Sequence, residues 1–170
     1  NRIFGDKLIK NDYLKFSNPQ RTDSLKLEII KEFYIYSDEN FRFAQIDAEE
    51  LSEFNFDFFV PKLNKILEKR NIFLDVKTEP DYQKSHEITI NGEKIKLYTD
   101  EELTNDKYWE SAPRNFFRKI NGLLDSKNSD EKFYLLYDGN DLSVILLTEK
   151  QFEIIKSYYK NDVKETPYLP

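Results

Sequence analysis

The sequence predicts an α+β domain, in which an antiparallel or mixed sheet is built from hairpins and helices pack on one side of it. Three observations support this fold class. Aromatic residues make up 15% of the 170 residues, a content typical of folded chains and not of disordered ones. Two segments have the signature of a β-hairpin. Stretches with helical spacing of apolar residues lie between and after them, and hairpins joined by helices indicate a sheet that helices cover.

We expect residues 1–170 to form a single domain, because the length suits one core and no stretch rich in Gly, Pro or Ser divides the chain. The two ends are weakly patterned. Residues 1–24 are predicted to be a loosely packed N-terminal segment, and Pro167 and Pro170 mark a loose tail.

The first strongly patterned segment is Leu25–Tyr36. Its apolar residues alternate and then form an aromatic and β-branched run, which predicts strands. A hairpin through Ser37–Asn40 would lead into a further strand at Phe41–Ile46. A helix over Leu25–Tyr36 is the alternative, because short apolar runs fit either structure.

A helix is predicted to begin after Asp47, because Asp47 and Glu50 form a variant of the capping box. This helix would run from Ala48 towards Arg70, and Pro61 is expected to kink or split it, since proline lacks the amide donor. Ile72–Lys77 then has the composition of a strand.

The two hairpins are the clearest local signals. Asn91-Gly92 separates the alternating segments His86–Ile90 and Lys94–Tyr98, as in a type I′ turn. The second hairpin is Phe133–Leu147, with its turn at Asp138–Asp141. Its second arm is apolar throughout, so we expect that arm to be central in the sheet.

Two helical regions accompany the hairpins. Residues 100–124 have an apolar face with helical spacing; we expect Asp100 to cap this region and Pro113 to break it. Thr148 is expected to cap a final helix over residues 149–159.

No catalytic, cofactor-binding or metal-ligating residue stands out. The chain has no cysteine, which excludes disulfides, thiolate zinc sites and a cysteine nucleophile. Its single histidine, His86, belongs to no HxxxH, HExxH or HxH pattern, so we expect it to be structural. The four glycines form no phosphate-binding loop. Asp138–Asp141 fits a turn better than a calcium loop because apolar residues flank it. We therefore expect no cofactor.

The charge distribution is the most informative functional feature. The net charge is −6, and the segment Asp38–Asp57 alone carries −6, with seven acids and the single base Arg42. A second acidic group lies within Asp100–Asp106. The candidate partner-binding acids of the first segment are Asp38, Glu39, Asp47, Glu49, Glu50, Glu53 and Asp57. Six phenylalanines lie among them: Phe41, Phe43, Phe54, Phe56, Phe58 and Phe59.

An acidic surface with exposed rings suits a basic protein partner, because opposite charge steers the encounter and rings supply buried area. The same surface would repel nucleic acid. An ordinary solvated face is the alternative for this charge run. The single tryptophan, Trp109, is a candidate interface anchor, since Trp is enriched at binding hot spots, with core packing as its alternative.

No apolar run approaches the 18 or so residues of a membrane span, and Asn1–Lys10 has no signal-peptide core, so we expect a cytoplasmic protein without membrane contact. Lysine far outnumbers arginine and alanine is scarce, which indicates AT-rich codons and a bacterial origin.

The small acidic α+β profile, together with the hairpin Phe133–Leu147 before a final helix, resembles the immunity proteins of bacterial toxin–immunity systems. The resemblance implies a cytoplasmic protein that binds and blocks a cognate toxin, and it transfers no functional residue. We therefore expect a non-enzymatic protein-binding module that occludes a basic partner. The alternatives are a small enzyme with a carboxylate-based site, with or without a metal, and a regulatory subunit of a larger assembly. No pattern in the sequence defines the oligomeric state.

Overall fold

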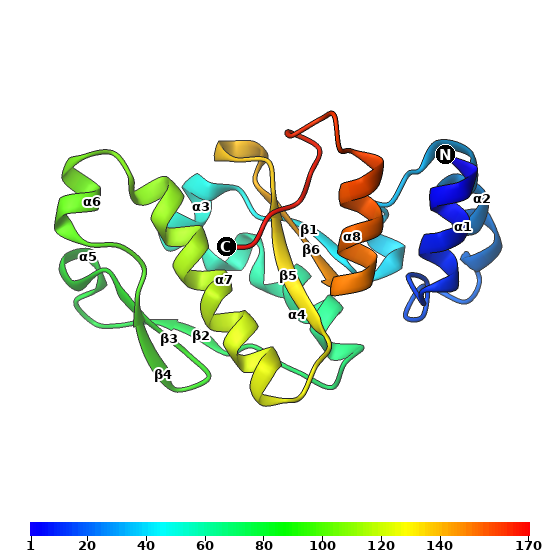
Figure 1. Ribbon diagram of the computed structural model, residues 1–170. Coiled ribbons are helices and arrows are strands. Elements are labelled where there is room, and N and C mark those ends of the chain that lie inside the picture. The colour runs from blue at the N-terminus through cyan, green and yellow to red at the C-terminus, as the bar shows by residue number, and fades with distance from the viewer.

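The centre of the molecule is a three-stranded antiparallel sheet, seen in a computed structural model that describes residues 1–170 (Figure 1). The strand order is β1-β6-β5, and the strands are β1 (Phe43–Gln45), β5 (Glu131–Leu136) and β6 (Ser143–Thr148). β6 lies between the other two, as its apolar run predicted. Together with the eight helices and a second antiparallel sheet, this arrangement confirms the α+β class.

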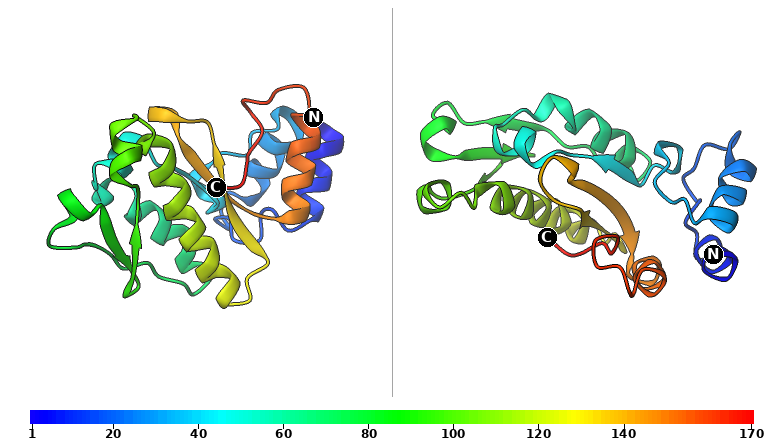
Figure 2. Two further views of the ribbon diagram at one scale, coloured as in Figure 1. Left: turned by 60° about the vertical axis from the view of Figure 1, so that its left-hand side comes forward. Right: turned by 90° about the horizontal axis from the view of Figure 1, so that it is seen from above.

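Successive residues of β6 point into two different cores, because side chains alternate across a strand. Val144 and Leu146 belong to a cluster of 24 buried residues. Ile145 and Leu147 belong to a second cluster, of 11. Helices therefore cover both faces of this sheet, whereas the sequence led us to expect them on one side (Figure 2).

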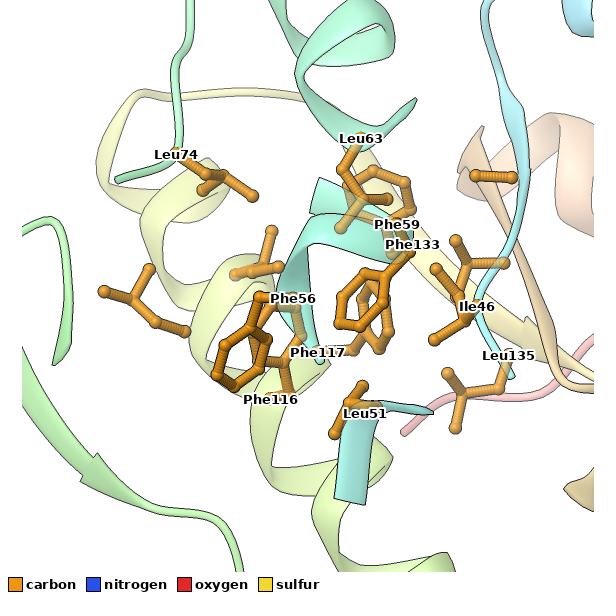
Figure 3. Close-up of a cluster of buried hydrophobic side chains, with 14 of the residues drawn as sticks. Ile46, Leu51, Phe56, Phe59, Leu63, Leu74, Phe116, Phe117, Phe133 and Leu135 are labelled. Carbon is orange, nitrogen blue, oxygen red and sulfur yellow. The ribbon is translucent and has the colours of Figure 1, made fainter. Parts of the chain in front are cut away.

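The larger core packs three helices against one face of the sheet: α3 (Ala48–Ser52), α4 (Val60–Glu68) and α7 (Tyr108–Ser126). Aromatic rings fill its middle, and Phe116, Phe117 and Phe133 lie in contact there (Figure 3). α7 has 19 residues, and neither it nor any other helix is long and apolar enough to cross a bilayer.

The smaller core lies under α1 (Arg2–Lys10), α2 (Thr22–Glu32) and α8 (Glu149–Tyr158) on the opposite face. Leu8 and Tyr13 are fully buried in it. Residues 1–24 thus form a helix and contribute to a core, which is more order than the loosely packed segment we expected.

The second sheet has the order β2-β3-β4 and consists of β2 (Val76–Thr78), β3 (Glu87–Ile90) and β4 (Glu93–Lys96). Asn91 and Gly92 have φ values of 51° and 81°, so the predicted type I′ hairpin is confirmed. Ile88 and Ile90 place one face of this sheet on the larger core. The short helix α5 (Tyr82–Ser85) joins β2 to β3.

The strands predicted within Leu25–Tyr36 were wrong, and the alternative helix is present as α2. Leu25 and Ile29, four residues apart, are buried on one side of α2, while Leu27 between them is 53% exposed. The predicted hairpin turn is instead the 3-10 segment η1 (Asp38–Asn40), which precedes β1.

The predicted long helices are divided, but not where their prolines suggested. Between α3 and α4 lies the 3-10 segment η2 (Phe56–Phe58), and Pro61 sits in the first turn of α4, where a missing amide costs nothing. Thr99, not Asp100, caps α6 (Asp100–Thr104). The chain breaks between α6 and α7, and Pro113 lies inside α7.

The C-terminal elements follow the prediction except at the tail. The turn between β5 and β6 contains η3 (Gly139–Asp141), and Thr148 caps α8 in a capping box with Gln151. The tail was expected to be loose, yet Tyr168 exchanges two backbone hydrogen bonds with Leu135 at the free edge of β5.

Candidate protein-binding surface

The fold separates the seven candidate acids into two groups at opposite ends of β1. Asp38 and Glu39 lie in η1, before the strand. The carboxylate of Glu39 pairs with Arg21 at 3.3 Å, so part of its charge is already matched. The other five acids lie in and around α3 and η2, after the strand, and none of them forms an ion pair: Asp47, Glu49, Glu50, Glu53 and Asp57.

Two of these acids, Asp47 and Glu49, form hydrogen bonds that fix the position of α3. The Asp47 carboxylate accepts hydrogen bonds from the backbone amides of Glu49 and Glu50 at 3.0 and 3.5 Å, which makes it the N-cap as predicted. Glu49 also accepts a hydrogen bond from Asn140 in η3, at 3.1 Å. The carboxylates of Glu53 and Asp57 are exposed and accept no hydrogen bond from another residue of the chain.

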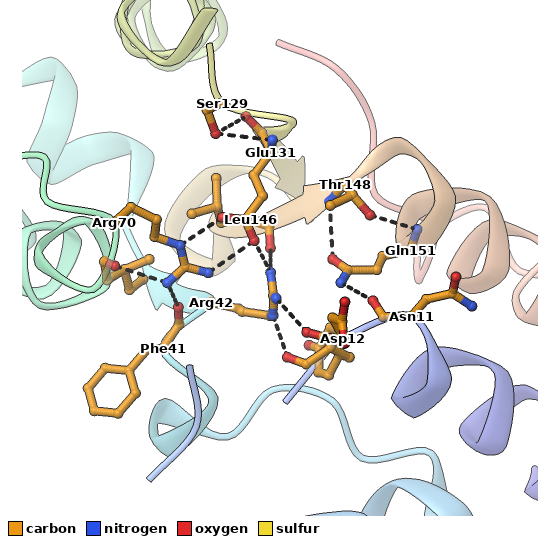
Figure 4. Close-up of polar contacts among 12 residues, drawn as sticks. Asn11, Asp12, Phe41, Arg42, Arg70, Ser129, Glu131, Leu146, Thr148 and Gln151 are labelled. Carbon is orange, nitrogen blue, oxygen red and sulfur yellow. Dashed lines mark hydrogen bonds and ion pairs between the residues drawn. The ribbon is translucent and has the colours of Figure 1, made fainter. Parts of the chain in front are cut away.

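The base within this segment does not reach the surface. The side chain of Arg42 is 1% exposed and pairs with Glu131 (Figure 4). Arg70 pairs with the same carboxylate at 2.8 Å. Because Arg42 is buried and compensated, the surface charge of the acidic segment is more negative than its sequence sum. This network was not predicted, because its partners lie in separate parts of the chain and no local pattern links them.

Trp109 lies in the first turn of α7 and is 39% exposed, which makes it neither a core residue nor a fully free side chain. It lines a surface hollow of about 460 Å³, here called the acidic hollow. The residues of the hollow that matter here are Ala48, Asp106, Trp109, Glu110, Asp138 and Tyr168. Its two basic residues are Lys107 and Arg114, of which Arg114 pairs with Glu110 at 3.3 Å.

α3 and α6, which carry the two acidic groups of the sequence, flank the start of α7. On one side α3 packs against α7, and Ala48 of α3 lines the hollow together with Trp109. On the other side, the Ser111 hydroxyl of α7 donates to the Glu102 carboxylate at 2.6 Å. That bond and the Thr99 amide lower the pKa of Glu102 below its ordinary value, so this acid stays ionised.

Most phenylalanines of the acidic segment are buried or half-buried, and few are exposed at the surface. Phe56 and Phe59 are buried, and Phe41, Phe43 and Phe54 are half-buried. Only Phe58 is exposed, and the Lys62 ammonium lies 4.5 Å from its ring centre. Phe58 is thus the one ring that the acidic segment exposes, and Trp109 is the exposed ring of the acidic hollow.

Behind Trp109 lies a chain of rings in contact: Tyr108, Tyr98 and His86. Trp109 meets Tyr108 edge to face, with ring centres 5.9 Å apart, and Tyr108 lies 5.3 Å from Tyr98. His86 stacks on Tyr98 at 4.4 Å and is 4% exposed, in agreement with a structural role. A half-exposed indole on such a support loses little conformational entropy when a partner covers it.

The structure brings no three carboxylate or histidine side chains together in a group that could hold a metal ion. The Asp138–Asp141 turn contributes Asp138 to the acidic hollow instead, a role that the sequence did not indicate.

Ala48 of α3, Asp106 after α6, Asp138 of the β5–β6 turn and Trp109 line one hollow, and a functional assignment can rest on it. Asp106, Glu110 and Asp138 were missed as candidates, although the sequence had marked Asp100–Asp106 as acidic. The chain matches no protein-family model, no curated protein and no solved structure.

Proposed function

We propose that this protein is a non-enzymatic binding module of the immunity type, which occludes a basic protein such as a toxin inside the cytoplasm. The observation that carries the proposal is the position of Trp109. It is half-exposed at a hollow lined by three acids from two separate segments of the chain: Asp106, Glu110 and Asp138. Of the two bases in the hollow, Arg114 is paired with Glu110.

The two components of this surface have different physical roles. Acids of α3 and α6 create a negative potential that accelerates the approach of a basic partner, an effect that salt screens. Trp109 supplies apolar area and a rigid anchor, which lowers the rate of dissociation. Inhibition would follow from occlusion, because a partner seated on this end of the molecule has its own basic surface covered.

The partner is to be identified by capture on the immobilised protein, with low-salt and then high-salt washes. We expect a basic protein retained in about equimolar amount and released as salt rises. Trp109→Ala should weaken its binding by about 2 kcal/mol, mainly through faster dissociation. Asp106→Lys with Asp138→Lys should mainly slow association.

Two variants serve as matched controls, measured by surface plasmon resonance against the captured protein. Phe73→Ala removes an aromatic ring that is 68% exposed elsewhere on the surface. Glu32→Lys with Asp162→Lys reverses two exposed acids that lie outside the acidic hollow and form no ion pair. Equal losses in the test and control variants, or unchanged binding by Trp109→Ala, would refute the assignment of this surface.

A further inference from the structure

A second hollow, of opposite charge, lies at the other end of α7. It has a volume of about 700 Å³, within the range of small-molecule sites. Its walls come from the end of α1, from the segments that follow α1, α4 and α7, and from the start of α8. Only two of its 17 lining residues are hydrophobic, so an apolar ligand finds little to bind.

The charge of this hollow, here called the basic cavity, is inverted relative to the whole chain. Seven basic and three acidic side chains line it, a formal charge of +4 in a protein of net charge −6. Its five lysines are exposed and form no ion pair, and they come from four separate parts of the chain: Lys10, Lys15, Lys69, Lys127 and Lys150.

The wall behind these lysines holds a buried charge that the protein does not balance. Arg42 and Arg70 share the one carboxylate of Glu131, and the three side chains are 1%, 6% and 7% exposed (Figure 4). Two guanidinium groups and one carboxylate leave one positive charge in the wall. Buried net charge is unfavourable, and an anion in the cavity would compensate it.

The two arginines set the potential of the site, but each already uses four of its five N–H donors within the protein. The Arg42 nitrogens donate to Glu131 and to the carbonyl oxygens of Asp12, Tyr13 and Leu146. Those of Arg70 donate to Glu131, Phe41 and Ile66. Direct contact with an anion therefore falls mainly to the lysines, whose ammonium groups have three donors each.

We propose that the basic cavity binds a small anion that carries several phosphate groups. Separate lysine ammonium groups around one hollow suit several phosphates, since each acts as a point charge. The start of α8, with Thr148, Lys150 and Gln151 in the wall, adds the positive end of a helix dipole. Base stacking contributes little, because the Arg70 guanidinium lies 4.0 Å from the ring centre of Phe16, the one aromatic side chain of the wall.

The proposal does not depend on the acidic hollow, so it is tested on the isolated protein. Inorganic tripolyphosphate is the probe, titrated by calorimetry at low salt, with orthophosphate and sulfate for comparison. We expect saturable 1:1 binding of tripolyphosphate that is tighter than binding of either smaller anion and weakens as salt increases.

The decisive variant replaces three rim lysines: Lys15→Gln, Lys127→Gln and Lys150→Gln. Its Kd should rise about tenfold, because each exposed charged contact contributes roughly a two- to threefold factor. The charge-matched control is Lys31→Gln, Lys84→Gln and Lys160→Gln, which are exposed, form no ion pair and lie outside the cavity. The control should stay within about twofold of the parent protein.

Three outcomes would overturn the proposal. The first is no saturable binding of tripolyphosphate. The second is an equal loss in the two lysine variants, which would mean that net charge and not the cavity attracts the anion. The third is a single-stranded oligonucleotide that binds through the same lysines more tightly than tripolyphosphate, which would make the site one for nucleic acid.

Discussion

At the scale of single residues, Glu131 stands out because its buried carboxylate pairs with two buried arginines, Arg42 and Arg70. Burial alone would raise the pKa of its carboxyl, but the guanidinium groups of Arg70 and Arg42 outweigh burial and hold the pKa below its ordinary value. Without this carboxylate, two buried guanidinium groups would face each other unpaired. A complete buried ion pair adds little to the free energy of unfolding, but removing one partner costs several kcal/mol, so the protein needs Glu131 for stability.

We expect Glu131→Gln to lower the free energy of unfolding by about 3–5 kcal/mol, the cost of leaving buried charge unpaired. Urea unfolding measures this change, and Glu68→Gln, at an exposed and unpaired residue, is a control that should change stability by less than about 0.5 kcal/mol.

Because the pKa of Glu131 is depressed in the folded state, its contribution to stability is complete above the unfolded pKa of about 4.3. It is lost as pH falls through the folded value. The stability gap between the parent and Glu131→Gln should therefore narrow below about pH 4, and a gap that widened there would contradict the assignment.

At the scale of elements, the contact between α1 and α2 depends on the absence of a side chain. A Cβ atom built on Gly5 of α1 would lie 2.8 Å from the carbonyl oxygen of Ile29 and 2.9 Å from the Cα of Ile30, both backbone atoms of α2. Backbone atoms move only if the whole helix moves. Gly5 thus sets the distance between the two helices that cover the smaller core.

We expect Gly5→Ala to destabilise the protein by about 1–3 kcal/mol, although alanine is the better helix former, because α1 must move away from α2. Gly122→Ala is a matched control within α7. Its Cβ would meet no atom within 4 Å, so it should stabilise by about 0.5–1 kcal/mol through helix propensity alone. Thermal or urea unfolding of both variants decides the matter, and a stabilising Gly5→Ala would show that the two helices are free to separate.

At the scale of the whole molecule, the net charge of −6 is unevenly distributed, because the acidic hollow and the basic cavity lie at different ends of α7. The acidic hollow adjoins the first turn of α7, and the basic cavity includes Lys127, which directly follows its last residue. The 19 residues of α7 span about 28 Å, which is roughly three Debye lengths at physiological ionic strength. The two sites are therefore electrostatically separate, and each can act on a ligand of opposite charge.

We expect the two sites to bind independently. Saturating tripolyphosphate should change the Kd for the captured basic partner by less than about twofold at physiological salt, since screening removes direct coupling over this distance. The measurement is a titration of the partner with and without the anion. A large change would mean that both ligands compete for one surface or bias a shared conformational change.

The sequence by itself determined the features that depend on neighbouring residues. The Asn91-Gly92 turn, the Asp47 and Thr148 caps and the central position of β6 follow from local backbone preferences and from an uninterrupted apolar run. Its acidic bias was also visible in the sequence, and so was the presence of one tryptophan.

Tertiary structure decided everything that depends on distant partners. Leu25–Glu32 is helical because Leu25 and Ile29 meet the smaller core, a choice that an ambiguous apolar run leaves open. The pairing of Arg42 with Glu131, the gathering of α3 and α6 at Trp109 and the convergence of five lysines on one cavity join segments far apart in the chain. The packing of helices on both faces of the sheet brings these charges together, and local sequence patterns do not predict such long-range contacts.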